Sequence, residues 1–263
     1  MTQTHSVIER SNITLSAILI TKNEAHQIKD CLESINFCDE IILVDNCSQD
    51  STLQIAMAYG CYVIQTNDWP GYGAQKQRAL DAAKGRWILS IDADERVTPE
   101  LREEILKSIE TESVQGYFIK RRSRFLGRWM RFGGWHPDYV LRLAQRDKCK
   151  FEQAKVHEKL IIEGIPKKLH SHFLHYSYSG IEDLLSKQKK YALLSAEKIR
   201  LRNGVKCSVV LSKLRSLWTF FRLYFLQLGF LDGREGFISA TFKSEEVFWK
   251  YVAAEFEARK HLK

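Results

Sequence analysis

The sequence lacks the segments that carry a protein into or across a membrane. Its N-terminus is mixed polar, with Glu9 and Arg10, and has no apolar core for a signal peptide. The apolar stretch 217–230 is shorter than the ~20 residues that span a bilayer, and Arg222 interrupts it. The six cysteines form no CxxC pair and, without a secretory signal, are expected to be reduced thiols. These absences together predict a cytoplasmic protein.

Acidic residues are missing from the most basic part of the chain. The formal net charge is +8, and its densest run is residues 120–131, where basic side chains are mixed with large apolar ones. Such a run would be attracted to an anionic membrane surface or to a phosphorylated glycolipid. It would also be attracted to nucleic acid. A solvated strand or loop edge is the third interpretation, and the run itself does not choose among them.

Short apolar runs alternate with helical patterns through the first hundred residues. The runs are 15–20, 41–44, 62–64 and 87–91, and each leads into a polar loop. After the first loop, apolar residues at 28, 32 and 35 form one helical stripe. This alternation predicts an α/β fold, a mostly parallel sheet with helices on both faces. Ligands of such sheets bind beyond the carboxyl ends of the strands, where these loops lie.

Two carboxylates, Asp92 and Asp94, follow the last of these apolar runs. On an extended chain they would point to opposite faces, so they converge only where the strand breaks into a turn. One or two carboxylates with substrate phosphates are the usual protein site of Mg²⁺, so this pair indicates a site for Mg²⁺ or Mn²⁺ that handles phosphate. The alternative is a solvated turn before a helix, because Thr98 suits the N-cap and Pro99 the first helical position.

Four motifs in this order and spacing resemble family 2 glycosyltransferases of the GT-A fold. They are Thr-Lys-Asn-Glu at 21–24, Val-Asp-Asn-Cys-Ser-Gln-Asp at 44–50, Gly-Tyr-Gly-Ala-Gln-Lys-Gln-Arg at 71–78 and Ile-Asp-Ala-Asp-Glu-Arg-Val-Thr at 91–98. Within the family, the sequence is most similar to bacterial inner-core lipopolysaccharide transferases that add a β-1,4-linked glucose to the first heptose. That similarity continues at residues 135–138, 156–158 and 229–234.

The resemblance implies a nucleotide-sugar site in the first part of the chain. Its expected residues are Thr21, Asn23, Glu24, Asp45, Asn46, Lys76, Arg78 and Asp92. Many relatives have Asp-Asp where this chain has Asp45 and Asn46, and Asn both donates and accepts hydrogen bonds. Uridine recognition stays compatible with that change. Lys76 falls where relatives often carry Arg, facing the base or diphosphate; Arg78 is the alternative, and a solvated basic helix face is the non-functional interpretation of both.

The metal site is likewise implied by resemblance. Asp94 is expected to ligate Mg²⁺ or Mn²⁺ directly, whereas Asp92 reaches the ribose or binds the ion through water. By analogy with some GT-A enzymes, His175 completes the ion's shell or touches the diphosphate, although an ordinary partly buried histidine fits as well. Zinc is not expected, because the spacing of His170, His172 and His175 matches no structural zinc pattern.

An inverting transferase needs a general base for the acceptor hydroxyl, and a carboxylate near the acceptor is the usual choice. The family's Glu-Asp pair followed by Arg is not present here in its usual form. Asp138, with Arg142 four residues later, occupies about that position and is the first candidate. Glu158 is the second, and for either one a salt bridge to a nearby basic residue is the structural alternative.

The expected organisation has four parts, ending in a basic helical region. The parts are an N-terminal tail, 1–12, a nucleotide-sugar-binding GT-A half, 13–115, an acceptor-side half with the basic stretch, 116–180, and a C-terminal helical region, 181–263. In the last part, stretch 217–230 fits either an amphipathic helix in the membrane interface, with Arg215 and Arg222 at its polar edge, or a core helix.

The sequence thus predicts an inverting, metal-dependent glycosyltransferase. The resemblance implies that it moves a hexose, glucose from UDP-glucose, to an inner-core heptose of a lipid A-linked saccharide, as a peripheral protein on the inner face of the cytoplasmic membrane. An alternative acceptor is a polyprenyl phosphate or another surface polysaccharide. A dehalogenase-type phosphatase is excluded because Arg96 stands where it needs Thr or Val. A basic nucleic-acid-binding protein would leave the carboxylate turn and its companion loops without a purpose.

Overall fold

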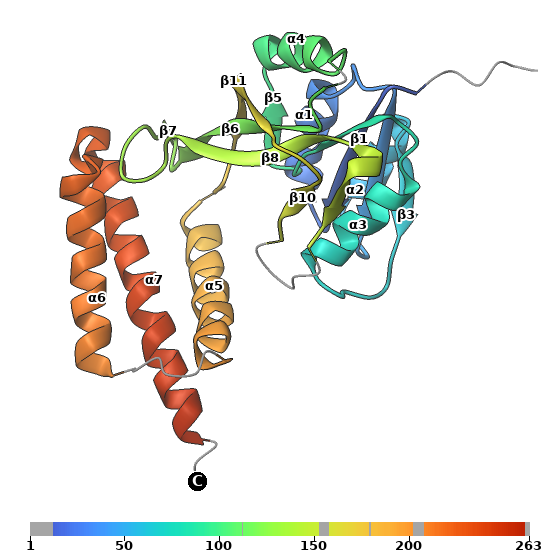
Figure 1. Ribbon diagram of the computed structural model, residues 1–263. Helices are drawn as coiled ribbons and strands as arrows, with labels where there is room; N and C mark the ends of the chain where they lie inside the picture. The colour runs from blue at the N-terminus through green and yellow to red at the C-terminus, as the bar shows by residue number, and fades with distance from the viewer. Residues whose placement is uncertain (1–12, 112, 153–157, 179, 202–207, 261–263) are drawn as a thin grey trace, which may run out of the picture. The chain divides into compact units, whose positions relative to one another are not determined.

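The computed structural model describes residues 13–111, 113–152, 158–178, 180–201 and 208–260 (Figure 1). The predicted N-terminal tail, 1–12, lies outside these residues, as do Val156 and His157 of one quoted motif. The chain divides into two compact units, the first with residues up to 119 and 140–171, the second with 120–139 and those from 172 onward. The predicted boundaries near 116 and 180 stay predictions.

The first unit is built on a sheet whose leading strands are parallel. In the order β3-β2-β1-β4, these are β3 (Tyr62–Gln65), β2 (Glu40–Asp45), β1 (Leu15–Thr21) and β4 (Trp87–Ser90). β4 is buried throughout and β1 nearly so, because helices cover both faces of a parallel sheet and its strands are therefore continuously apolar. The predicted α/β, mostly parallel GT-A-type fold is confirmed.

Further strands extend this sheet in the order β8-β6-β11-β5, with β8 antiparallel to β4. Their bounds are β5 (Glu95–Val97), β6 (Gly116–Phe125), β8 (Asp138–Gln145) and β11 (Lys167–His175). β6, β8 and β11 each continue along the chain into residues of the second unit. A separate antiparallel pair consists of β9 (Cys149–Phe151), which follows the short helix η1 (Arg146–Lys148), and β10 (Leu160–Ile162).

Three helices connect the parallel strands: α1 (Ala25–Ser34), α2 (Thr52–Ala58) and α3 (Tyr72–Ala82). A fourth, α4 (Pro99–Ser108), lies between β5 and β6. The apolar stripe that the sequence predicts after the first loop lies on the buried side of α1 and its C-cap, since Ile28, Leu32 and Ile35 are fully buried. Helix α3 packs on β1 and β2. The N-cap predicted for α4 is confirmed, because the Thr98 hydroxyl accepts a hydrogen bond from the Leu101 N–H at 3.2 Å.

The second unit contains the C-terminal helices, as predicted. They are α5 (Ile181–Leu201), α6 (Val209–Phe221), η2 (Arg222–Leu226), η3 (Gly229–Asp232) and α7 (Gly233–Lys260), and the strand β7 (Arg128–Trp129) pairs with β6. Both α5 and α6 pack along α7 (Figure 1). The core of the second unit joins the β6–β7 hairpin to the helices through Phe125, Met130, Leu184 and Phe242.

The stretch 217–230 is not one helix. Helix α6 ends at Phe221, a wider π-helical turn follows, and Leu228 adopts a left-handed φ of 57° before η3 begins. Among the residues that the structure describes, no helix is long and apolar enough to cross a membrane.

Candidate active site

The predicted site residues of the first unit begin where its parallel strands end. Thr21 closes β1 and lies directly opposite Asp45, which closes β2. The Thr21 hydroxyl donates to Asp45 Oδ1 at 2.9 Å. Asp45 is fully buried, and it also accepts hydrogen bonds from the hydroxyl of Ser48 and from its N–H, the latter at 2.8 Å. Asp45 therefore fixes the turn that follows β2.

The amide of Asn46 links two loops of the first unit. Its Nδ2 donates to the carbonyl oxygens of Thr66 at 3.2 Å and Asp68 at 2.8 Å. Its Oδ1 accepts from Lys22 Nζ at 3.3 Å. A carboxylate at this buried position has no proton to donate to two carbonyls. Asn46 thus ties the loop after β2 to the loop after β3.

The first loop is held against the second by backbone and side-chain bonds. Asn23 has a left-handed φ of 57°, which Asn tolerates better than most residues. Its N–H donates to Ser48 Oγ at 2.8 Å, and its Oδ1 accepts from the Gln49 N–H at 2.8 Å. The N–H of Glu24 donates to Thr52 Oγ1 at 2.8 Å. The loop at 21–24 and the loop at 45–52 form one framework.

Lys76 joins two of the predicted carboxylates. Its ammonium lies 2.9 Å from Asp92 Oδ1 and 2.7 Å from Glu158 Oε1. The Lys76 side chain is 7% exposed and that of Glu158 is 14% exposed. Lys76 is therefore not on a solvated basic face, and the salt bridge that was the structural alternative for Glu158 is present.

Arg142 and Glu95 complete this charged group. The Arg142 guanidinium hydrogen-bonds Asp92 Oδ2, and it lies 3.1 Å from Oε1 of the fully buried Glu95. Glu95 Oε2 in turn accepts the Asp92 N–H at 3.0 Å. Burial would raise the pKa of Asp92, but Arg142 and Lys76 hold it well below its usual range. Burial likewise opposes the charge on Arg142, yet Asp92 and Glu95 raise its pKa above the usual value.

Glu95 and Arg142 lie within or beside the predicted motifs, but no role was predicted for either residue. A signal was present for Arg142, which stands between Leu141 and Leu143 in an otherwise apolar part of β8. A buried arginine requires a carboxylate partner because an unpaired buried charge is costly. That reasoning identifies the need for a partner, but it does not identify Asp92 and Glu95, which lie far away in the sequence.

Arg78 is engaged elsewhere in the first unit. Its two terminal nitrogens lie 2.8 and 2.6 Å from the two carboxylate oxygens of Asp68, and its side chain is 37% exposed. The hydrogen bond from Arg78 lowers the pKa of Asp68. Of the two predicted cations, Lys76 therefore meets the Asp92 carboxylate, and Arg78 instead braces the loop that Asn46 also holds.

A divalent cation bound directly by Asp92 would compete with the side chains that already hold this carboxylate. Both Asp92 oxygens face cationic side chains, Lys76 and Arg142, so a direct metal bond would have to displace one of them. Asp94 lies partly exposed in the turn after β4. No group of three or more His, Cys, Asp or Glu residues with metal-binding geometry occurs among the described residues. Mg²⁺ held mainly by substrate phosphates and water needs only one or two carboxylates.

The remaining candidates, Asp138 and His175, belong to the second unit. Asp138 Oδ2 accepts from Arg121 at 2.9 Å (Nε) and 2.6 Å (Nη2), and its side chain is 36% exposed. His175 Nδ1 lies within hydrogen-bonding distance of the Ser123 and Ser177 hydroxyls, at 2.9 and 3.0 Å. Both candidates for the general base therefore have a cationic partner.

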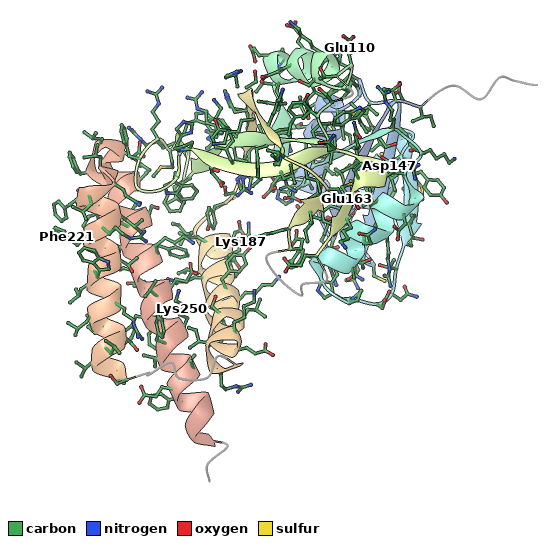
Figure 2. All side chains as sticks on the ribbon, viewed as in Figure 1. Glu110, Asp147, Glu163, Lys187, Phe221 and Lys250 are labelled. Carbon is green, nitrogen blue, oxygen red and sulfur yellow. The ribbon has the colours of Figure 1, made fainter. Side chains whose placement is uncertain are left out.

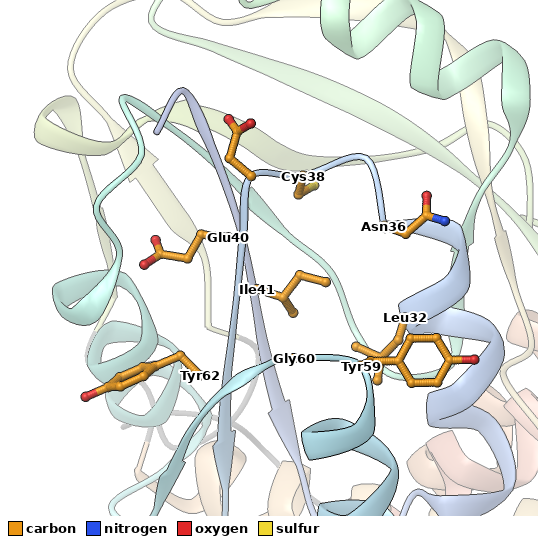
Figure 3. A pocket seen from close by; sticks show the side chains of 9 residues that line it. Leu32, Asn36, Cys38, Glu40, Ile41, Tyr59, Gly60 and Tyr62 are labelled. Carbon is orange, nitrogen blue, oxygen red and sulfur yellow. The ribbon is translucent and has the colours of Figure 1, made fainter. Parts of the chain in front are cut away.

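A pocket in the first unit lies away from these loops (Figure 3). Glu40 and Tyr62, which begin β2 and β3, line it together with Leu32 and Tyr59. It is therefore at the amino ends of the strands, at the edge opposite to Asp45. None of the predicted site residues lines it.

Comparison with known proteins gives a family match over most of the sheet. Residues 16–164 match the family described as Glycosyl transferase family 2. The lipopolysaccharide core biosynthesis glycosyltransferase LpsC of Rhizobium meliloti (strain 1021) is 31% identical over an alignment of 265 positions, which covers 95% of this chain and 94% of that protein. The uncharacterized glycosyltransferase RP128 of Rickettsia prowazekii (strain Madrid E) is 30% identical, covering 86% of this chain and 81% of its own length.

A solved structure shares the fold. The crystal structure of S. aureus TarS 1-349 in complex with UDP-GlcNAc superposes with a TM-score of 0.50 at 15% sequence identity. The match covers 94% of this chain and 92% of that one. At this identity the likeness concerns the fold alone.

Proposed function

Because this chain belongs to glycosyltransferase family 2, we propose that it transfers glucose from UDP-glucose to an inner-core heptose of a lipid A-linked saccharide, with inversion at the sugar carbon. The observation that carries the proposal is the set of interlocked loops at the carboxyl edge of the sheet, with Lys76, Asp92 and Arg142 paired beside it. The choice of acceptor is supported by the name of the R. meliloti relative, which matches this chain over nearly its full length.

The donor would bind along the loops after β1, β2 and β4. Thr21, Asn23, Glu24, Asp45 and Asn46 would surround the base and ribose, where the two loops are already joined by hydrogen bonds. Lys76 would approach the diphosphate, and Arg142 would keep Asp92 ionised for the ribose or a water. Arg78 supports this region through Asp68.

Asp94 would hold Mg²⁺ or Mn²⁺, an ion that neutralises the diphosphate as it departs from the sugar. Asp92 would act on the ion through water, because its two oxygens already face Lys76 and Arg142. His175 remains a candidate for the ion's shell or for the diphosphate, and its Nδ1 faces two hydroxyls.

Asp138 is the proposed general base. An acceptor hydroxyl must reach the base directly or through one water. The Asp138 side chain is 36% exposed, whereas that of Glu158 is 14% exposed and lies against Lys76. Glu158 would then position Lys76. If so, Asp138→Asn lowers kcat by at least a hundredfold with little change in the KM for the donor, whereas Glu158→Gln raises that KM.

The acceptor determines where the enzyme works. A lipid A-linked saccharide is embedded in a membrane, so the protein would act as a peripheral protein on the inner face of the cytoplasmic membrane. The second candidate acceptor is a polyprenyl phosphate or another surface polysaccharide. The same donor loops would serve it.

The test is release of UDP from a panel of nucleotide sugars with Mg²⁺, Mn²⁺ or EDTA, in the presence of heptose-terminated truncated lipopolysaccharide. We expect metal-dependent turnover of UDP-glucose that is lost in Asp94→Ala. Asp147→Ala is the matched control, because it removes an exposed carboxylate of the same unit that lies outside the site (Figure 2). Turnover that persists in EDTA or in Asp94→Ala would contradict the metal assignment. Turnover only with polyprenyl phosphate would favour the second acceptor.

A further inference from the structure

Helix α6 buries its small polar residues and exposes its large apolar ones. Ser212 is fully buried and Ser216 is 4% exposed. The exposed residues on this helix include Val210 (72%), Leu214 (57%), Leu217 (54%), Trp218 (58%) and Phe221 (44%). An amphipathic helix of a globular protein normally turns its apolar stripe toward the core. Here the arrangement is reversed, so the apolar stripe has no partner among the described residues.

These apolar residues share one side of the helix. Positions 210, 214, 217 and 221 follow the i, i+4, i+7, i+11 spacing of a single helical stripe. Rings continue the stripe past the end of α6, since Trp218 and Phe221 are 5.9 Å apart and Phe221 and Phe225 are 5.4 Å apart between centroids. Figure 2 shows Phe221 on the side of α6 away from α7. We name Val210, Leu214, Leu217, Trp218, Phe221 and Phe225 the outer face.

The charged side chains in the segment that carries the outer face are all basic. Residues 208–231 contain Lys213, Arg215 and Arg222 and no aspartate or glutamate. Lys213 and Arg222 are exposed, and their positions on the helix place them on opposite sides of the stripe. The first acidic residue after this segment, Asp232, is buried. An apolar stripe bordered by cations is the pattern of helices that lie in the interface of an anionic membrane.

The β6–β7 hairpin adds further cations beside the same segment. Asp232 of η3 accepts hydrogen bonds from the N–H groups of Arg131 and Phe132 at 2.9 and 2.8 Å, and Arg128 lies 3.5 Å from its other oxygen. Arg124, Arg128 and Arg131 are all exposed. The end of the basic run, at Arg128 and Arg131, is therefore fixed next to the chain that follows α6, within one compact unit.

We propose that the outer face of α6, together with the arginines of the β6–β7 hairpin, docks on an anionic lipid bilayer. A second copy of the chain would place Lys213 and Arg222 against the same cations, which like-charge repulsion opposes. Anionic headgroups instead attract each of these side chains, while Trp218 and Phe221 enter the boundary between headgroups and acyl chains. The proposal rests on the proposed function in that the acceptor is lipid-linked.

The test is co-sedimentation of the full chain with phosphatidylcholine vesicles, with and without phosphatidylglycerol. We expect binding that requires phosphatidylglycerol and weakens with salt. The double variant Leu217→Ser/Phe221→Ser should lose at least tenfold in partitioning. Lys213→Gln/Arg222→Gln should lose roughly fivefold per cation, and only with the anionic vesicles. Ile165→Ser is the matched control, because it removes an exposed apolar side chain of the first unit (86% exposed).

Three results would overturn the proposal. One is the absence of binding to anionic vesicles by a wild-type chain with a normal thermal transition. Another is equal binding by the wild type and Leu217→Ser/Phe221→Ser. The third is a dimer in light scattering that this double variant dissociates, because the outer face would then join two copies.

A second readout separates this proposal from the proposed function. With a deacylated, water-soluble core oligosaccharide as acceptor, the variant Leu217→Ser/Phe221→Ser should release UDP at the rate of the wild type. With the same acceptor in anionic vesicles it should be slower by the factor lost in partitioning. Vesicle binding without turnover on either acceptor would leave the docking surface in place and contradict the acceptor assignment.

Discussion

At the scale of single residues, the loops that follow β1, β2 and β3 depend on a few polar side chains whose partners are distant in sequence. Asn46 is the clearest case, because its amide supplies donors to two carbonyls and an acceptor to Lys22. Asn46 thus holds two loops together. Its contribution to stability is separable from any contact with a nucleotide.

Asn46→Asp should destabilise the fold, because it replaces a donor by a carboxylate that faces the carbonyl oxygens of Thr66 and Asp68. The Asp68 carbonyl keeps its hydrogen bond from Gln75, so the loss of the two Asn46 bonds, with a charge placed against two carbonyl oxygens, should cost about 1–3 kcal/mol in total. We expect a loss of that size in urea unfolding, with an unchanged m-value. Asn36→Asp makes the same change at an exposed position and should cost less than about 0.5 kcal/mol. Equal losses in the two variants would contradict this role of Asn46.

The ion pairs of Asp92 should make the stability of the fold depend on pH in one specific direction. The folded pKa of Asp92 is held below the unfolded value of about 3.9, so its ionised form stabilises the folded state. This contribution is fully present above about pH 4 and is lost as the pH falls through the lower folded pKa. The difference in unfolding free energy between wild type and Asp92→Asn should therefore be constant near neutrality and shrink below about pH 4. A difference that grows on acidification would contradict the assigned direction.

At the scale of elements, α6 shows that an apolar stripe need not mark the buried side of a helix. Because one side of α6 is buried and the other exposed, exchanging a polar and an apolar residue should change stability by different amounts on the two sides. Ser216→Leu inserts a large side chain into a closely packed position and should cost about 1–3 kcal/mol. Leu217→Ser, one residue later on the exposed side, should change stability by less than about 0.5 kcal/mol. Thermal or urea unfolding of the two variants measures this directly, and the reverse ranking would mean that α6 is oriented differently.

At the scale of the whole molecule, we assign donor binding to the first unit, and membrane docking to the second, which also carries the proposed base Asp138. Hydrogen exchange should show this. UDP-glucose with Mg²⁺ should slow the exchange of amides in the loops at 21–24 and 45–52, because ordering a loop raises the free energy of local opening. Anionic vesicles should instead slow exchange in α6 and the segment 222–232. Protection of α6 by UDP-glucose without vesicles would contradict this division of tasks.

The sequence by itself determined the α/β fold and the positions of the loops at the carboxyl edge of its parallel strands. Each apolar run followed by a polar loop specifies a strand that ends at the ligand-binding edge, and this information is local. The motifs at 21–24, 44–50, 71–78 and 91–98 therefore indicated the family, which the match over residues 16–164 confirms. The N-cap at Thr98 was readable for the same reason.

Only the tertiary structure decided which charges meet and which side of α6 is buried. Asp92, Glu95 and Arg142 come from separate strands and turns, and Lys76 reaches Glu158 across 82 residues of chain. No local pattern encodes such pairs, because they form only when distant segments are brought together. The stripe 210–221 is visible in the sequence, but whether a stripe faces a core or a solvent is set by the packing of neighbouring helices, here α6 against α7.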